Sequence, residues 1–358
     1  MNTLDNLQKI KKLDPQKVLE SIGFGGQQIN QAWGEFKKIK IPASYRQINK
    51  VVINGMGGSG LPGHMLRSVF FDQIKVPVGV INSYQLPASL DKNTLYVISS
   101  YSGTTEEPLS TLIQAKKRGA KVFGIAYGET LGGWIKQKKL PGYVFDPVYN
   151  PSSQPRMGLG YSFGAHLALF NKLGLIKVKP EQIKQSLKTL ASFDKKFNVT
   201  IGQKSNSAKK FAQDLQDRIP IIIASEFLAG NAHIFTNQIN ENAKTFASYF
   251  LIPELNHHLL EGLTFPKANR NNLCFVFFES NLYHPKTQIR YRVTKQVVAK
   301  NKIKVLTYRL TAKDQLSQAL EMLVFGSYTS FYLAVLNNIN PSKIPWVDYF
   351  KYQLKKYN

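Results

Sequence analysis

The sequence contains one cysteine and a small share of acidic residues. Cys274 has no second cysteine with which to form an internal disulfide. Its place in the apolar run 273–278 favours a buried structural thiol over a nucleophile. The 22 Asp and Glu residues stand against 47 Lys and Arg residues, which gives a formal net charge of +25. Such an excess favours anionic partners, so phosphorylated metabolites, nucleic acid and acidic membranes all remain open at this point.

Long apolar runs, a secretory leader and clustered metal ligands are also missing. No apolar run approaches the ~18 residues of a membrane span, and residues 1–5 do not have the shape of a signal peptide. We therefore expect a cytoplasmic protein with no membrane partner. The six histidines are scattered, and the adjacent His257 and His258 would face different directions on a helix, so we expect no metal site.

The clearest motif that the sequence does contain is the glycine-rich segment Asn-Gly-Met-Gly-Gly-Ser-Gly at residues 54–60. A short apolar run at 50–53 predicts a buried strand before it, and Pro62 suits the first turn of a helix after it. This order places free backbone N–H groups at the positive end of a helix, and such a position favours anion binding. Three of the glycines also satisfy the dinucleotide pattern G-x-G-x-x-G, so a dinucleotide site and a plain tight turn stay open.

A second loop favours a phosphate monoester over a dinucleotide. The predicted strand at 95–98 leads into residues 99–108, which are rich in serine and threonine and precede a predicted helix at 106–118. Carboxyl ends of parallel strands lie at one edge of a sheet, so hydroxyls and amides from both loops converge there. The only acidic residue near the spacing required for reading a ribose is Asp72, and it does not clearly end a strand.

Strands and helices alternate along most of the chain, which predicts an α/β fold with doubly wound, mainly parallel sheets. We expect a helical lead-in at 1–40 that packs on the first sheet, a domain at 41–150 and a second domain at 151–358, with the linker at 150–155. The expected strands lie near 50–54, 78–82, 95–99, 121–126, 143–145, 219–226, 273–278 and 303–308. Further helices are expected from about 157 to 173 and at 181–194, 204–217, 312–336 and 346–356.

Several short stretches resemble known families. The pair Gly57-Gly58-Ser59-Gly60 and Ser100-Tyr101-Ser102-Gly103-x-Thr105-Glu106 resembles the flavodoxin-like sugar isomerase (SIS) domain, which binds phosphosugars. Pro155-Arg156-x-x-Leu159-Gly160, Asn240-Glu241-Asn242-Ala243-Lys244 and Glu254-Leu255-Asn256-His257 resemble the bifunctional phosphoglucose/phosphomannose isomerase family in the same order. The resemblance covers roughly residues 40–358 and implies two SIS domains and a homodimer with sites near the subunit interface.

The resemblance implies a role for each matched residue. Glu241 would be the base, His257 the ring-opening residue, Arg156 the stabiliser of enediolate charge and Lys351 a sugar-contacting lysine. The phosphate would be bound by Gly58, Ser59, Ser100, Ser102 and Thr105. These residue types suit aldose–ketose isomerisation, which needs a carboxylate to move a proton, a group that titrates near neutral pH and a cation at the developing charge. No metal and no redox cofactor is required.

We therefore expect an isomerase that interconverts glucose 6-phosphate, mannose 6-phosphate or both with fructose 6-phosphate. A non-catalytic SIS protein that senses a phosphosugar is the alternative. Residues 281–313 contain many Lys and Arg and no acidic residue, but we interpret them as a solvated face and do not expect nucleic acid as a partner. The chain departs from the family pattern at Thr104, Pro108, His258 and Leu259, which leaves the preferred sugar open.

Overall fold

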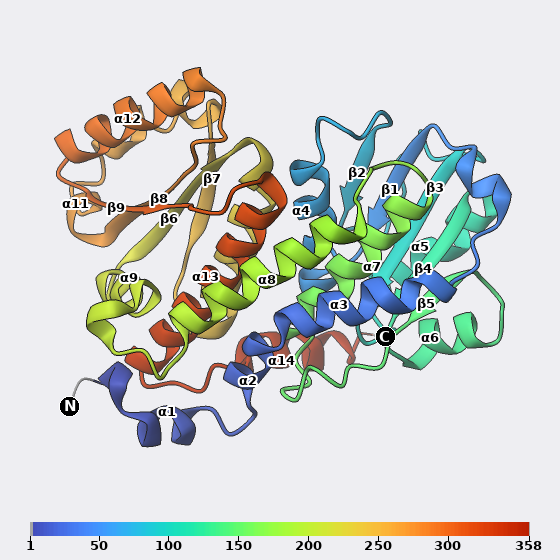
Figure 1. Cartoon of the computed structure of the whole chain (residues 1–358), viewed down its shortest axis with the longest axis horizontal. Helices are drawn as coiled ribbons and strands as arrows, with labels where there is room; N and C mark the ends of the chain where they lie inside the picture. The colour runs from blue at the N-terminus through green and yellow to red at the C-terminus, as the bar shows by residue number, and fades with distance from the viewer. Residues whose placement is uncertain (1–2, 358) are drawn as a thin grey trace.

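The computed structural model describes residues 3–357 and contains two parallel β-sheets that lie side by side (Figure 1). The first sheet has the strand order β2-β1-β3-β4-β5 and the second the order β7-β6-β8-β9. All of the strand pairs are parallel. The strands are β1 (Lys50–Asn54), β2 (Val78–Ile81), β3 (Thr94–Ser100), β4 (Lys121–Ala126), β5 (Gly142–Val144), β6 (Ile219–Ser225), β7 (Ser248–Ile252), β8 (Leu273–Glu279) and β9 (Lys304–Arg309).

Both sheets place their first strand between their second and third, which is the flavodoxin-like order. The α/β prediction with separate parallel sheets is therefore confirmed. In the first sheet the chain reverses its direction of winding between β1 and β3. Ligands of open α/β sheets bind beyond the carboxyl ends of the strands at such a point, so the two predicted phosphate loops lie where this rule expects a site.

Helices surround both sheets (Figure 1). They are α1 (Leu7–Leu13), α2 (Val18–Gly23), α3 (Gly25–Glu35), α4 (Leu61–Val69), α5 (Glu106–Lys117), α6 (Glu129–Lys136), α7 (Leu159–Lys172), α8 (Pro180–Phe197), α9 (Ser207–Leu215), α10 (Ala229–Gln238), α11 (Asn269–Asn272), α12 (Pro285–Lys300), α13 (Gln315–Leu336) and α14 (Pro345–Leu354). Four short turns matter for the site, namely η4 (Gly57–Ser59), η5 (Pro155–Met157), η8 (Ile239–Ala243) and η9 (Glu254–His257).

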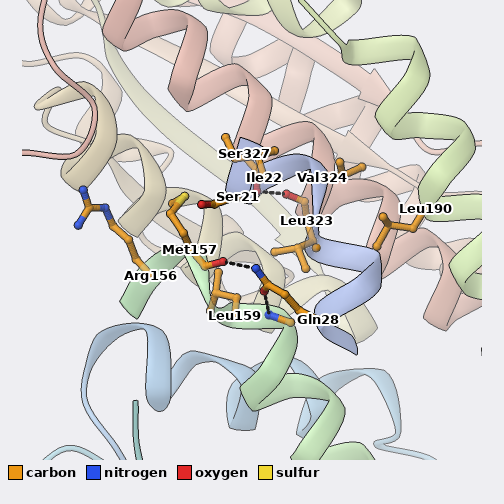
Figure 2. Close-up of a pocket in the computed structure, with 12 residues that line it drawn as sticks. Ser21, Ile22, Gln28, Arg156, Met157, Leu159, Leu190, Leu323, Val324 and Ser327 are labelled. Atoms are coloured by element: carbon orange, nitrogen blue, oxygen red, sulfur yellow. Dashed lines mark hydrogen bonds between the residues drawn. The ribbon is translucent and has the colours of Figure 1, made fainter. Parts of the chain in front are cut away.

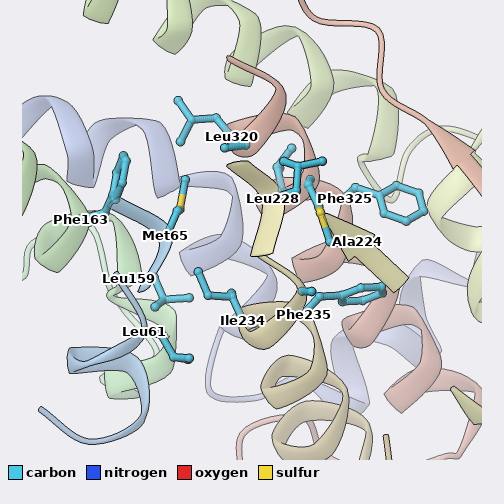
Figure 3. Packing of buried hydrophobic residues seen from close by; sticks show 14 of the residues in the cluster. Leu61, Met65, Leu159, Phe163, Ala224, Leu228, Ile234, Phe235, Leu320 and Phe325 are labelled. Atoms are coloured by element: carbon cyan, nitrogen blue, oxygen red, sulfur yellow. The ribbon is translucent and has the colours of Figure 1, made fainter. Parts of the chain in front are cut away.

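One buried apolar cluster extends through both halves of the chain. Figure 3 shows Leu61 and Met65 of α4 on the side of Ile234 of α10, whereas Phe235 lies on the other side of α10 toward Ala224. The two helices pack so closely that a Cβ added at Gly230 would lie 2.4 Å from the Cα of Met65. The second sheet is thus fixed against the first by helix packing rather than by shared strands. The predicted boundary at residues 150 and 151 stays a prediction.

The amino-terminal helices are part of the same packing. Helix α3 lies against α7, and the ring of Phe36, just after α3, lies 5.7 Å from the rings of Phe123 in β4 and Tyr143 in β5. Gln28 of α3 donates hydrogen bonds to the carbonyls of Tyr149 and Met157, both at 2.9 Å. These bonds hold the segment that leads into η5.

Helix α13 corrects one expectation from the sequence. Its 22 residues, Gln315–Leu336, are long and apolar enough to cross a membrane by length and composition. The expectation that no run approaches this length was therefore wrong. In the structure 83% of the most apolar window of α13 is buried inside the protein. Its side chains pack on α8, α9 and α10, so within residues 3–357 it forms the central helix of the core.

Candidate active site

The first predicted phosphate loop lies directly after the buried strand β1. The chain turns through η4 and enters α4, with Pro62 in the first helical turn as predicted. Ser59 is buried, and its hydroxyl accepts a hydrogen bond of 2.8 Å from the backbone N–H of Tyr101. This bond joins the loop after β1 to the loop after β3. The two loops therefore form one edge of the site.

The second loop gathers the remaining predicted hydroxyls between β3 and α5. The hydroxyl of Ser100 accepts from the N–H of Gly103 at 3.1 Å and is hydrogen-bonded to the hydroxyl of Thr105 at 2.9 Å. Ser102 is hydrogen-bonded to the hydroxyl of Thr104 at 3.0 Å. The structure thus brings Ser59, Ser100, Ser102 and Thr105 together in two linked loops, each of which begins a helix.

Arg156 lies against the first of these loops. A Cβ added at Gly58 would lie 2.9 Å from the carbonyl oxygen of Pro155 and 3.0 Å from the Cα of Arg156, so only glycine allows this approach. The side chain of Arg156 is 5% exposed. Its Nε donates to Asn242 Oδ1 at 2.9 Å and its Nη1 donates to Gln154 Oε1 at 2.9 Å. Arg156 is therefore a buried, fixed cation beside the phosphate loops rather than a surface residue.

Glu241 lies in η8, a π-helical turn that continues α10, and not in a regular α-helix. Its carboxylate is 3.8 Å from Nη1 of Arg156, and its side chain is 31% exposed. Burial raises the pKa of Glu241, whereas the charges of Arg156, Lys351 and Lys244 act in the opposite direction. The ammonium of Lys244 turns away from Glu241 and donates to the carbonyls of Asn242 and Asn340 at 3.2 Å and 2.8 Å.

The turn before α14 fastens the carboxyl-terminal helix to this cluster. Nη2 of Arg156 donates to the carbonyls of Pro341 and Ser342 at 2.8 Å and 2.7 Å. Burial raises the pKa of Glu241 and lowers that of Arg156, and two residues of α14 oppose these shifts by charge, namely Lys351 at Glu241 and Asp348 at Arg156. The predicted Lys351 therefore lies on the same side of the protein as Glu241 and Arg156.

His257 is the predicted residue that the chain does not bring to the others. It is exposed in η9, which follows the carboxyl end of β7, whereas η8 with Glu241 precedes the amino end of β7. Asn240 of η8 is hydrogen-bonded to Ala247, just before β7. The five residues of β7 separate its two ends by roughly 15 Å at ~3.3 Å per residue. Within residues 3–357, no hydrogen bond or ion pair links His257 to Glu241.

The small cavity shown in Figure 2 is not the sugar site. Its volume of about 40 Å³ is far below that of the ~300–1,000 Å³ pockets that hold small molecules. In Figure 2 the guanidinium of Arg156 points away from the other labelled side chains. The hydrogen bonds of Gln28 to Met157 and Gly160 fix the backbone after Arg156. The residues around this cavity therefore hold the backbone next to Arg156 in place and do not bind the sugar.

Sequence reasoning missed part of this arrangement. The Asn242 and Lys244 side chains and the carbonyls of residues 340–342 were not predicted, although the first two belong to the motif that pointed to Glu241. No group of three or more His, Cys, Asp or Glu side chains within residues 3–357 is placed to hold a metal ion.

Comparisons with known proteins show the family of the chain. The profile described as "Bacterial phospho-glucose isomerase C-terminal SIS domain" matches residues 204–354. The chain is 34% identical over 343 residues to a bifunctional phosphoglucose/phosphomannose isomerase of Caldicellulosiruptor bescii, covering 94% of this chain and 98% of that protein. A protein of the same name from Thermoplasma acidophilum is 28% identical over 88% of this chain and 93% of its own length.

A solved structure supports the fold independently. The crystal structure of a hypothetical protein from Thermus thermophilus superposes with a TM-score of 0.74, at 15% sequence identity, over 98% of this chain and 94% of that one. At this identity the likeness concerns the fold alone. The identity and coverage of the Caldicellulosiruptor relative carry the assignment. The chain belongs to the bifunctional phosphoglucose/phosphomannose isomerase family.

Proposed function

We propose that the protein is a phosphosugar isomerase that interconverts glucose 6-phosphate and mannose 6-phosphate with fructose 6-phosphate. The observation that carries the proposal is the meeting of a partly buried carboxylate and a buried guanidinium, Glu241 and Arg156 at 3.8 Å, beside two linked hydroxyl-rich loops. The relatives named above carry the corresponding activity in their names. Neither relative is named as a sensor, so nothing favours the non-catalytic alternative.

Each step of the reaction has a candidate residue. His257 protonates the ring oxygen and thereby opens the sugar. Glu241 removes the proton from C2 of the open aldose and delivers it to C1, so that an aldehyde becomes a ketone through an enediolate. Arg156 stabilises the negative charge that develops on the enediolate oxygens. Lys351 contacts the sugar from α14. No electrons leave the substrate. The atoms balance because one proton moves from C2 to C1 through Glu241, where it can exchange with water, and one hydroxyl proton moves from O2 to O1.

The phosphate would bind at Gly58, Ser59, Ser100, Ser102 and Thr105. Helices α4 and α5 begin at these loops, and the positive ends of helix dipoles favour an anion there. The phosphate takes no part in the proton transfer. Its binding energy instead holds C1 and C2 in register with Glu241.

We propose that a homodimer completes the site, with the partner subunit's His257 reaching Glu241. The roughly 15 Å between the ends of β7 argues against a site built from one chain. Helix α14 supports the same proposal, because it carries Lys351 and none of its residues is buried. Its exposed apolar side chains, which a second subunit would cover, are Trp346, Val347, Tyr349, Phe350, Tyr352 and Leu354.

The proposal also covers the domains, the partners and the cellular compartment. The phosphate loops belong to a domain at 41–150, and the proton-transfer residues belong to a domain at 151–358. The net charge of +25 attracts phosphosugars, and neither nucleic acid nor membrane is a partner. The reaction takes place in the cytoplasm, where phosphorylated sugars are used.

A coupled assay with fructose 6-phosphate tests the function directly. Both aldose products are followed separately, and incorporation of deuterium at C2 of these products is measured in samples prepared in deuterated water. We expect both products and solvent exchange. Absence of exchange with every one of the three sugars would refute the proposal, whereas one missing product would only remove one substrate.

A further inference from the structure

Lys244 occupies an unusual place in the site. It directly follows η8 and lies three positions after Glu241, with a backbone φ of 50°. This left-handed region is costly for residues other than glycine and is typical of positions that the surrounding structure enforces. The ammonium turns back and donates to the carbonyls of Asn242 and Asn340. Lys244 is thus held between the turn that carries Glu241 and the segment before α14.

The carboxylate of Glu241 depends on its charged neighbours. Among residues 3–357 no group donates a hydrogen bond to it, and burial raises its pKa. The charges that oppose burial come from three elements, namely Arg156 on η5, Lys351 on α14 and Lys244 after η8. Besides Glu241, the negative charge that acts on Arg156 is that of Asp348. Charge, rather than hydrogen bonding, therefore limits the rise that burial causes in the pKa of Glu241.

The three cations are held in different ways. The guanidinium of Arg156 is committed to Asn242, Gln154 and two carbonyls of the turn before α14. Lys351 belongs to an exposed helix. Only Lys244 is attached to the same turn as Glu241, and its own pKa is lowered to about 8 by burial and by Arg156 while Glu241 raises it. Lys244 and Glu241 therefore influence each other at neutral pH.

We propose that Lys244 is a positioning residue for Glu241, whose ammonium keeps the Glu241 carboxylate ionised while its two carbonyl bonds fix η8 against the segment before α14. It acts through Glu241 and needs no contact with the sugar. The proposal rests on the proposed function for its catalytic meaning. Its effect on the ionisation of Glu241 exists without turnover and can be measured separately.

The test compares three variants of the full-length protein. Lys244→Gln keeps donors for the two carbonyls but removes the charge, Lys244→Met removes both, and Lys244→Arg keeps both. Protein labelled with ¹³C at the glutamate carboxyls is titrated by NMR, and the Glu241 signal is assigned by its loss in Glu241→Gln. Lys343→Gln is the matched control, because it removes an exposed charge next to the same turn.

We expect the Glu241 pKa to rise by roughly one unit in Lys244→Gln and Lys244→Met, which is the lower end of the effect of a neighbouring opposite charge. Lys244→Arg and Lys343→Gln should leave it unchanged. The acid limb of kcat/KM should move by the same amount in the two uncharged variants, and KM should stay constant at high pH. A merely structural lysine would alter stability but not this limb.

Two outcomes separate the proposals. The same Glu241 pKa in Lys244→Gln and Lys244→Arg would overturn the role of Lys244, whatever the activity. If Lys244→Gln shifts the Glu241 pKa but the wild-type protein does not exchange the aldose C2 proton, the proposed function is refuted and the inference stands. Circular dichroism verifies folding, and Lys244→Gln keeps the experiment decisive where Lys244→Met fails to fold.

Discussion

The replacement Glu241→Gln should lower activity and raise stability at neutral pH. Glutamine keeps the shape of glutamate but cannot accept a proton, so kcat should fall by about 10²–10⁴-fold. That loss corresponds to about 3–5 kcal/mol of activation free energy. The phosphate loops are separate from Glu241 in sequence and are fixed by their own hydrogen bonds, so KM should change little.

The effect on stability follows from the raised pKa of Glu241. Burial is the largest influence on this carboxyl and outweighs the opposing charges of Arg156, Lys351 and Lys244. A carboxyl whose pKa is higher in the folded than in the unfolded state favours folding at low pH, and this contribution is lost as the pH rises through the folded value. Glutamine does not titrate, so Glu241→Gln does not lose this stability as the pH rises. The variant should match the wild type near pH 4 and gain stability relative to it toward pH 7.

Steady-state kinetics, C2 proton exchange and urea denaturation at several pH values measure these quantities. Glu254→Gln is the control, because its carboxylate is exposed and pairs with His258 on the surface. It should change neither kcat nor exchange. Wild-type exchange in Glu241→Gln would remove Glu241 from the mechanism. A variant that is less stable than the wild type at pH 7 would show that the neighbouring charges, rather than burial, dominate at this carboxyl.

Three further predictions concern the remaining site residues. The double variant Ser100→Ala, Ser102→Ala should raise KM strongly, because each lost hydrogen bond to phosphate is worth roughly 1.5–3 kcal/mol, and an unchanged KM would exclude these loops. Mixing inactive Glu241→Gln and His257→Ala proteins under subunit exchange should restore about a quarter of wild-type activity when sites are shared between subunits, and none when each chain is complete. Arg156→Lys should cost about 2–5 kcal/mol of unfolding free energy in urea, since lysine cannot reach all four acceptors that the guanidinium satisfies, and an unchanged midpoint would contradict this.

Local patterns predicted most of the framework. Buried strands such as β1 and β6 are short β-branched runs, and the linker before η5 is rich in proline and serine, so each carries its signal within a few residues. The strand β7 was missed, although Ser248–Ile252 is aromatic and aliphatic and ends before Pro253. The motifs on either side of β7 were interpreted as helical, which hid a strand of five residues.

The site itself could not be derived from local patterns. Arg156 and Glu241 are far apart in sequence, and an isolated helical glutamate is ordinarily solvated. Only the resemblance to a family placed them together. The π-helical turn at η8 has no clear sequence signature, because it arises where α10 must end before the αL residue Lys244 and the edge strand β7. The resemblance also could not indicate that His257 would lie at the far end of β7.

The glycine loop shows why motif and structure can agree for different physical reasons. The sequence suggested that glycines at 55–60 let the backbone approach an anion. In the structure a Cβ at Gly58 would strike Pro155 and Arg156, and one at Gly60 would lie 2.1 Å from the carbonyl oxygen of Gly55. These two glycines are required by the packing of the chain on itself. The absence of a side chain at Gly58 lets this loop touch the turn that carries Arg156, and so connects the proposed phosphate site in the first half of the chain with the proposed proton-transfer residues in the second.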